Sequence, residues 1–423
     1  MRIAILAVGD ELLLGDVVNA NAAWLGRRLS DAGLQVVASA VVADDVAAIA
    51  AATRQLLSEA DAVVVSGGLG PTSDDVTRDA LAELAGVALV LDPVLERSVR
   101  QWFAGRGVSL TAGALRMAEL PAGATALANA AGTAPGVRLE VGGGLVVAVP
   151  GVPVELRDMV ERLVLPDLLA RSGAPHAIVT RTVHVALLGE SAVADRLTPL
   201  TEDIADAGVR LAYLAGLGAV QVRLTAQAPD RPGADAILGP LVQRVRDLVG
   251  DAVCGVDGET LDRAVHRLLA TGQATVAVAE SLTGGLLGSA LTDMPGSSKT
   301  FRGGVTAYAT ELKAWLLGVD PDLIEQVGAV HRSVAGQMAA GVRARLSATY
   351  GVATTGVAGP EPQDGRPAGT VHVAVAGPAG VVVASPTLTG GRDRIRRLTV
   401  VHALDLLRRV LSRLATPGAE QVA

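Results

Sequence analysis

The chain has 423 residues, a formal net charge of −7 at pH 7, 50% hydrophobic residues and a single cysteine, Cys254. A chain of this length can bury two or three large domain cores. The acidic balance and the absence of basic runs disfavour direct nucleic-acid binding, and no apolar run has the length of a membrane span, so no membrane partner is expected. The one cysteine excludes internal disulfides and cysteine-rich metal sites, which fits a cytoplasmic protein.

The first third of the sequence alternates buried strands with helices. We expect strands over residues 2–8, 36–42 and 62–66, separated by helices over 22–32 and 46–60. Short apolar runs that alternate with helical segments predict a parallel α/β sheet. Ligands of such sheets bind beyond the carboxyl ends of the strands, so the polar loops at those ends are candidate sites.

A glycine-rich loop, residues 67–77, follows the third of these strands. Its glycines permit close backbone approach to a ligand, and its N–H groups together with Thr72 and Ser73 can hold phosphate or pterin oxygens. Carboxylates at this loop and at the neighbouring strand ends can hold a divalent cation; they are Asp10, Glu11, Asp44, Asp74 and Asp75. Paired acidic residues after strands are also common as helix N-caps and in solvated loops, and composition alone favours that interpretation.

Four motifs in this region resemble the N-terminal domain of the CinA family; they are Gly9-Asp10-Glu11-Leu12-Leu13 and the segments 67–77, 129–136 and 150–155. The resemblance implies a molybdopterin-binding-like domain over residues 1–168 with an ADP-ribose pyrophosphatase activity. That activity would use a divalent metal (Mg, Mn or Co), with K as a further cation. The implied nucleotide-binding residues are Gly67, Gly68, Gly70, Thr72, Asn129, Gly132 and Thr133. Because segment 111–117 matches the family poorly, a binding domain without turnover stays open.

Residues 169–255 change pattern and predict a small α+β domain. We expect strands over 177–187, 209–214 and 219–226, and a helix over 234–249. This unit is similar to the KH-like middle domain of the CinA family. A KH domain clamps RNA with a Gly-x-x-Gly loop, and no such loop with flanking basic residues is present in the sequence. A spacer or dimerisation module is therefore expected.

Residues 256–423 predict a second α/β domain, with a buried strand over 274–279 that runs into a turn carrying Ser281. A turn between a strand and a helix exposes a hydroxyl, and nearby N–H groups can hold developing negative charge. Serine needs a base, and the six histidines form no pair with each other or with Ser281. Lys313 is the alternative base if burial lowers its pKa, although most lysines are solvated and most Ser-Gly turns are only turns.

Seven motifs here resemble the C-terminal domain of the CinA family, a nicotinamide mononucleotide amidohydrolase (deamidase); they are 279–285, 295–298, 301–305, Tyr308 with Lys313, 328–330, 355–360 and 369–371. The resemblance implies Ser281 as nucleophile, Lys313 as base and Tyr308 as a proton relay, without a cofactor. The implied substrate-binding residues are Thr283, Gly284, Gly285, Thr355, Gly356, Arg392 and Arg396, either arginine being suited to the 5′-phosphate. Glu280 is expected to cap the turn or orient Lys313. His331 stands where the family commonly has Ser, which predicts a changed helix N-cap.

The combined expectation is a bifunctional, cytoplasmic pyridine-nucleotide salvage enzyme that acts on nicotinamide mononucleotide and ADP-ribose, with a homodimer implied by the family. Two alternatives stay open. One is an amidase with a non-catalytic nucleotide- or pterin-binding N-terminal domain, and the other is a competence- or recombination-associated partner protein. A Ser-Lys peptidase or β-lactamase has weaker support, because Ser281 lacks the local Ser-x-x-Lys of that class.

Overall fold

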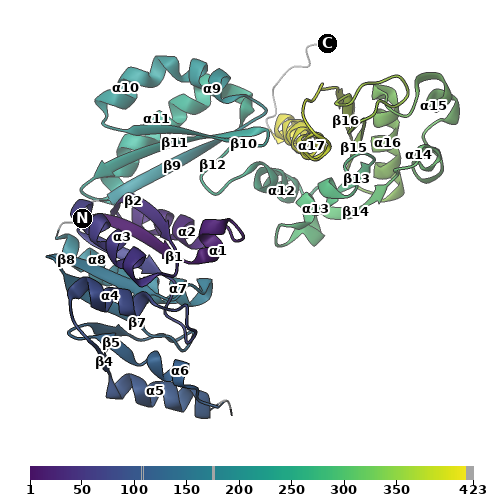
Figure 1. The fold of residues 1–423 in the computed structure, drawn as a ribbon. Coiled ribbons are helices and arrows are strands. Elements are labelled where there is room, and N and C mark those ends of the chain that lie inside the picture. Colours follow the sequence, from purple (N-terminus) through teal and green to yellow (C-terminus); the bar gives the residue numbers. More distant parts are fainter. Residues whose placement is uncertain (106, 108, 174–176, 416–423) are drawn as a thin grey trace. The chain divides into compact units, whose positions relative to one another are not determined.

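The computed structural model describes residues 1–105, 107, 109–173 and 177–415. The chain forms two compact units, one made of Met1–Val179 with Ala226–Ala236 and the other of Thr180–Thr225 with Ile237–Ala423 (Figure 1). Among the described residues, no helix is both long and apolar enough to cross a membrane.

The first unit is built on a six-stranded sheet of order β2-β1-β3-β8-β7-β6. The first four strands in this order run parallel, as the sequence predicts, whereas β7 and β6 are antiparallel to their neighbours, so the sheet is mixed. Only two residues separate β7 from β8, and so short a connection can join only antiparallel strands. The strands are β1 (Arg2–Val8), β2 (Gln35–Val42), β3 (Ala62–Ser66), β6 (Thr125–Leu127), β7 (Gly136–Val141) and β8 (Gly144–Val149).

Helices cover both faces of this sheet. Alternate residues of a strand face opposite sides, so Ala4 and Leu6 pack against α3 and α4 while Ile3 and Ile5 pack against α2, α7 and α8. The helices are α1 (Asp10–Leu14), α2 (Ala20–Asp31), α3 (Val46–Glu59), α4 (Thr77–Ala85), α5 (Pro93–Ala104), α6 (Ala112–Arg116), α7 (Pro153–Met159), η1 (Val160–Val164) and α8 (Leu165–Ser172); a two-stranded ribbon pairs β4 (Leu89–Leu91) with β5 (Glu119–Pro121).

The middle of the chain carries a four-stranded sheet of order β10-β11-β9-β12. The sequence predicts a linker over 255–258, but Val253–Val256 forms the edge strand β12, which pairs antiparallel with β9. Pairing with a distant strand, and not local propensity, makes this segment a strand. The elements are β9 (Ala177–Ala186), α9 (Glu190–Leu197), η2 (Thr198–Leu200), α10 (Thr201–Asp206), β10 (Arg210–Gly216), β11 (Ala219–Ala228), α11 (Arg231–Val249), η3 (Gly250–Ala252) and β12.

The C-terminal sheet has the order β14-β13-β15-β16-β17, and β13 is parallel to both of its neighbours. Ala277 and Ala279 of β13 pack against α16, while Val276 and Val278 pack against α12 and α17 on the other face. The elements are α12 (Leu261–Thr271), β13 (Val276–Glu280), α13 (Leu286–Thr292), η4 (Ser297–Lys299), β14 (Phe301–Thr306), α14 (Thr310–Leu317), α15 (Pro321–Val327), α16 (Arg332–Arg345), β15 (Tyr350–Gly356), β16 (Val371–Gly377), β17 (Gly380–Ala384) and α17 (Arg392–Ala415).

Candidate active site

Ser281 follows the last residue of β13, at the carboxyl end of a strand whose five residues are all buried. Its backbone N–H donates to the carbonyl oxygen of Thr354 at 3.0 Å, which fixes the start of the turn. Gly284 and Gly285 have φ angles of 58° and 98°, a left-handed conformation that residues with a Cβ adopt reluctantly. The Ser281 side chain is therefore carried on a tight turn that opens at the strand end.

Lys313 lies in α14, the helix that follows β14, and its side chain extends to Ser281 at the end of the neighbouring strand β13. Its Nζ lies 3.2 Å from Ser281 Oγ and 3.1 Å from the carbonyl oxygen of Ala307, and the residue is 2% exposed. Burial lowers the pKa of Lys313, and the charges of Asp364 and Glu311 oppose that shift. A buried lysine beside a serine hydroxyl combines a nucleophile with a group that can take its proton.

Glu280, which is 1% exposed, caps the short helix that follows the turn. Its carboxylate accepts from the backbone N–H groups of Gly285, Leu287 and Gly288 at 2.9, 3.0 and 2.8 Å. These contacts satisfy donors that a helix N-terminus leaves unpaired. Of the two roles that the sequence left open for Glu280, the structure shows the cap.

Three of the other predicted binding residues make hydrogen bonds that stabilise this turn. The Thr283 hydroxyl lies 2.7 Å from that of Thr354, and Thr283 is fully buried. Arg396 donates to the carbonyl oxygens of Leu282 and Thr283, both at 2.9 Å. The Gly284 N–H donates to the Ser281 carbonyl oxygen. These groups hold the turn that carries Ser281 in place.

A cavity of about 430 Å³ opens in front of the serine and the lysine. The predicted site residues that line it are Ser281, Tyr308, Lys313, Thr355, Gly356 and Arg392, and the loop 357–363 forms another wall. The Thr355 hydroxyl is bonded to the carbonyl oxygen of Ala329 at 2.9 Å. The structure thus gathers six predicted residues from four distant segments around one cavity, whereas the same cavity is not lined by Thr283, Gly284, Gly285 or Arg396.

Arg392 bridges two walls of this cavity. Its Nη1 donates to the carbonyl oxygen of Gly359 at 2.8 Å and its Nη2 donates to the Tyr308 hydroxyl at 2.7 Å. Within the described part of the chain, the Tyr308 hydroxyl makes no hydrogen bond to Ser281 or Lys313. The sequence does not predict this bridge, because no local sequence pattern relates two residues that lie 84 positions apart.

Two histidines come together elsewhere in this domain. The rings of His331 and His372 have centroids 6.3 Å apart, so the interpretation that the histidines form no pair is wrong for these two. His331 Nδ1 accepts from the Ser333 N–H at 3.2 Å, so His331 is the N-cap of α16. Neither histidine lines the cavity that contains Ser281.

The glycine-rich loop of the first unit is tightly built. A Cβ on Gly67 would lie 2.4 Å from the carbonyl oxygen of Val8, and one on Gly68 would lie 2.3 Å from Thr77 Oγ1. Asp75 accepts from the N–H groups of Gly70 and Thr72 at 2.7 and 2.9 Å. Asp75 therefore links two other residues of the loop through hydrogen bonds and stabilises its conformation.

Asn129 organises the second predicted nucleotide-binding segment. Its side-chain oxygen accepts from the Gly132 N–H at 2.9 Å, and its amide nitrogen donates to Glu155 at 2.6 Å. No hydrogen bond involving Thr133 occurs among the described residues. These contacts give Asn129 and Gly132 a role in loop shape and leave the Thr133 side chain available to a ligand.

The predicted metal ligands lie at neighbouring strand ends. The Asp10 N–H donates to Asp44 Oδ2 at 3.0 Å. Burial raises the pKa of Asp44, and the charges of Asp10, Glu11 and Asp74 add to that rise. Within the described ranges, no three His, Cys, Asp or Glu side chains are arranged to hold a metal ion.

Comparison with known proteins assigns the chain region by region. The CinA C-terminal domain matches residues 258–411, the KH domain of damage-inducible protein CinA matches 180–255, and a probable molybdopterin binding domain matches 4–170. A CinA-like protein of Frankia casuarinae is 50% identical over 426 residues, covering 99% of this chain and 98% of the relative. The chain belongs to the CinA family. A CinA-like protein of Geobacter sulfurreducens is 42% identical over 414 residues, covering 97% of this chain and 99% of the relative.

Solved CinA-family structures match single parts of the chain. The protein CinA of Thermoplasma acidophilum is 38% identical, with a TM-score of 0.36, and covers 38% of this chain and 94% of its own. The competence/damage inducible protein CihA of Agrobacterium tumefaciens is 35% identical, with a TM-score of 0.34, and covers 36% of this chain and 95% of its own.

Proposed function

We propose that the C-terminal domain hydrolyses the carboxamide of nicotinamide mononucleotide to the carboxylate and ammonia. The observation that carries this proposal is the buried contact between Lys313 Nζ and Ser281 Oγ at 3.2 Å, inside a cavity of about 430 Å³. A cavity of this size suits a small nucleotide more than a polymer. A peptidase would need an open groove for an extended chain.

In this mechanism the neutral amine of Lys313 takes the proton of Ser281 as the oxygen attacks the carboxamide carbon. The C–N bond then breaks, and the lysine returns the proton to the departing nitrogen, which leaves as ammonia. Water, deprotonated by the same lysine, attacks the acyl-serine ester. The bond between the acyl carbon and Ser281 Oγ breaks, the lysine returns the proton to Oγ, and the product acid leaves and ionises to the carboxylate. None of these steps requires a metal or another cofactor.

The oxyanion of the tetrahedral intermediate needs donors beside Ser281. The N–H groups of Gly284 and Gly285 donate to Ser281 and Glu280, so they are already used inside the turn. In the described part of the chain, the N–H groups of Leu282 and Thr283 make no backbone hydrogen bond. We therefore assign the oxyanion to the N–H group of Leu282, because Leu282 lines the cavity whereas Thr283 and the two glycines do not.

Arg392 is proposed to bind the 5′-phosphate. It lies at the cavity wall and donates only to two uncharged oxygens among the described groups, which leaves its charge without a paired carboxylate. The Arg392→Ala variant should raise KM for nicotinamide mononucleotide by about 10- to 100-fold, with little change for nicotinamide riboside, which lacks the phosphate. Steady-state ammonia release measures both substrates.

Two variants act as controls for this experiment. Arg397→Ala removes an arginine of the same helix that is paired with Asp393, and Tyr308→Phe removes only the hydroxyl that Arg392 holds. Both should keep KM near the wild-type value. An equal loss toward the nucleotide and the riboside in Arg392→Ala would contradict the phosphate assignment.

For the first unit, we propose a divalent-metal-dependent ADP-ribose pyrophosphatase. The support is the contact between Asp10 and Asp44 at adjoining strand ends, with the charge of Asp74 acting on Asp44. Since no three carboxylates of the described residues form a metal site by themselves, the substrate phosphates would have to complete the coordination. The ion would be Mg, Mn or Co, with K as a further cation, and carboxylates of this kind hold such ions together with substrate phosphates. We further propose a cytoplasmic homodimer without a membrane or nucleic-acid partner.

ADP-ribose cleavage should require added divalent metal and should fall by at least about 100-fold in Asp74→Ala. Asp74 is the better position for this test, because Asp75 holds the loop together and its removal would disturb the fold locally. Metal-independent cleavage, or binding of ADP-ribose without turnover, would favour a first unit that only binds nucleotide or pterin. A salt-dependent shift of DNA would favour the competence-associated alternative.

A further inference from the structure

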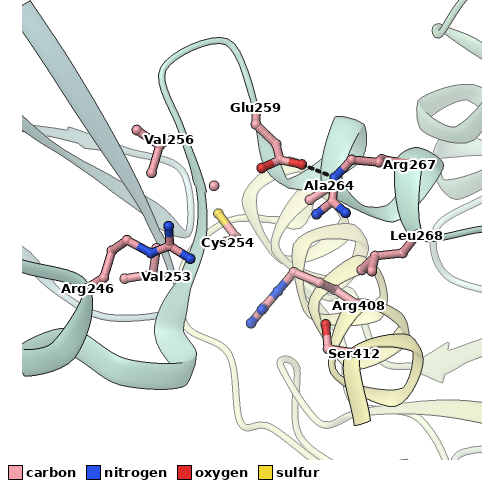
Figure 2. Close-up of a pocket in the computed structure, with 11 residues that line it drawn as sticks. Arg246, Val253, Cys254, Val256, Glu259, Ala264, Arg267, Leu268, Arg408 and Ser412 are labelled. Carbon is pink, nitrogen blue, oxygen red and sulfur yellow. Dashed lines mark hydrogen bonds and ion pairs between the residues drawn. The ribbon is translucent and has the colours of Figure 1, made fainter. Parts of the chain in front are cut away.

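A second cavity of the second unit lies between the middle sheet and the C-terminal domain, and no step proposed above uses it. Its volume is about 260 Å³, and its walls come from the end of α11, from β12 and the turn after it, and from α12 and α17 (Figure 2). It shares no lining residue with the cavity that contains Ser281. It is therefore a separate site.

The charged side chains that line this cavity are three arginines and one carboxylate. Arg246 comes from α11, Arg267 from α12 and Arg408 from α17, and Glu259 is paired with Arg267. Figure 2 shows the guanidinium groups of Arg246 and Arg408 entering the space from opposite walls. Two cationic groups thus face the cavity from different domains.

Arg408 is held in place while one edge of its guanidinium stays available. It is 8% exposed, its Nε and Nη2 donate to Asp405 at 3.0 and 2.8 Å, and Nη2 also donates to the Asp251 carbonyl oxygen at 2.6 Å. Its Nη1 makes no hydrogen bond within the described part of the chain, and no buried side-chain nitrogen there lacks a partner. Nη1 is consequently accessible to solvent, and because Arg408 lines the cavity, this nitrogen is available to a ligand there.

Arg246 is unpaired across the described residues, although it is two positions from Arg244, which pairs with Asp203. The remaining walls are neutral. Burial raises the pKa of the Cys254 thiol to about 11, so the thiol is uncharged and donates to the His184 carbonyl oxygen at 3.3 Å. A Cβ on Gly255 would lie 1.8 Å from the Glu259 carbonyl oxygen, so glycine is required where the wall turns.

We infer that this cavity binds the phosphoryl group of a small phosphorylated metabolite, held between Arg246 and Arg408. A tetrahedral phosphate offers oxygens to donors on two opposite sides and matches the planar edges of guanidinium groups. The volume exceeds that of a phosphate ion, and Ala264 and Leu268 supply an apolar wall for a short carbon skeleton. The occupant is either a phosphomonoester or free inorganic phosphate.

Occupancy would join the middle sheet to the C-terminal domain, because the two arginines belong to α11 and α17. Arg408 lies 12 residues along α17 from Arg396, which holds the turn that carries Ser281, and that separation is about 18 Å along a helix. A ligand that binds only the folded state raises its stability. The main expected effect of ligand binding at this site is thus a higher stability of the folded chain.

The test is calorimetric titration of the full chain with ribose 5-phosphate and, separately, inorganic phosphate, at constant ionic strength. Arg246→Ala should weaken binding at one site about tenfold, and Arg246→Glu should abolish that site and its rise in Tm. Arg244→Glu is the matched charge control, and Arg392→Ala separates this site from the active site; both should retain it. Tighter binding of the sugar phosphate identifies a phosphomonoester site, and equal binding identifies a phosphate site.

The inference is overturned if wild-type protein binds neither probe, or if Arg246→Glu gives the wild-type isotherm. Equal losses in Arg246→Glu and Arg244→Glu would also overturn it, because they would show a general effect of surface charge. Arg246 is exposed, so these variants are expected to fold, and their circular dichroism spectra should equal that of the wild type.

Discussion

Replacing Lys313 with methionine is expected to lower kcat for release of ammonia from nicotinamide mononucleotide by about 10⁴-fold. The lysine must be neutral to accept the Ser281 proton, and burial lowers its pKa from the ordinary value of 10.5. In the wild type, kcat/KM should therefore rise with pH up to the lowered pKa and be constant above it. The pH profile of ammonia release measures this directly.

The fold should survive this change. Methionine removes the desolvation penalty of the buried amine but leaves the Ala307 carbonyl oxygen without its donor, and the two effects oppose each other. The folded wild type binds the lysine proton less tightly than the unfolded chain, so its stability rises with pH between the lowered pKa and 10.5. The methionine variant should lack this rise. Wild-type activity in Lys313→Met would refute the base assignment.

The Glu280→Ala variant is expected to lower the free energy of unfolding by about 3 kcal/mol or more. The carboxylate accepts from three backbone N–H groups, of Gly285, Leu287 and Gly288, and its removal leaves them without an acceptor. The same loss loosens the turn next to Ser281, so ammonia release should fall as well. Urea unfolding followed by circular dichroism gives the first quantity.

A matched pair of variants separates the cap from a general effect of charge. Glu280→Gln keeps one acceptor oxygen and should lie between Glu280→Ala and the wild type. Glu325→Ala removes an exposed carboxylate of α15 and should change stability by less than about 0.5 kcal/mol. If Glu280→Ala unfolds at the wild-type urea concentration, the cap does not contribute as the geometry indicates.

The strands that carry the site can be predicted from the sequence, because their apolar runs are short and uninterrupted. The run that ends at Ala279 predicts a buried strand, and the glycines after Ser281 predict a sharp turn; both are present, with the strand ending one residue later at Glu280. The composition of segment 255–258 predicts a linker, because the pairing of β12 with β9 depends on residues some 70 positions away. The antiparallel end of the first sheet was likewise absent from the prediction of a parallel sheet.

The roles of the arginines could not be separated by sequence. Arg392 and Arg396 stand four positions apart on one helix, and both are suited to phosphate. In the structure, Arg396 donates to the carbonyl oxygens of Leu282 and Thr283. Arg392 instead lines the cavity. Only the parallel arrangement of β14 beside β13 brings Lys313 to Ser281, 32 residues away, and residue types alone do not establish that contact.

The most direct test of the account is ammonia release from nicotinamide mononucleotide by the purified full chain, measured beside Ser281→Ala. We expect release by the wild type and a loss of at least about 10⁴-fold in the variant, with both proteins unfolding at the same temperature. Full activity in Ser281→Ala, or no release by a folded wild type, would contradict the assignment of Ser281 and Lys313 as the catalytic pair.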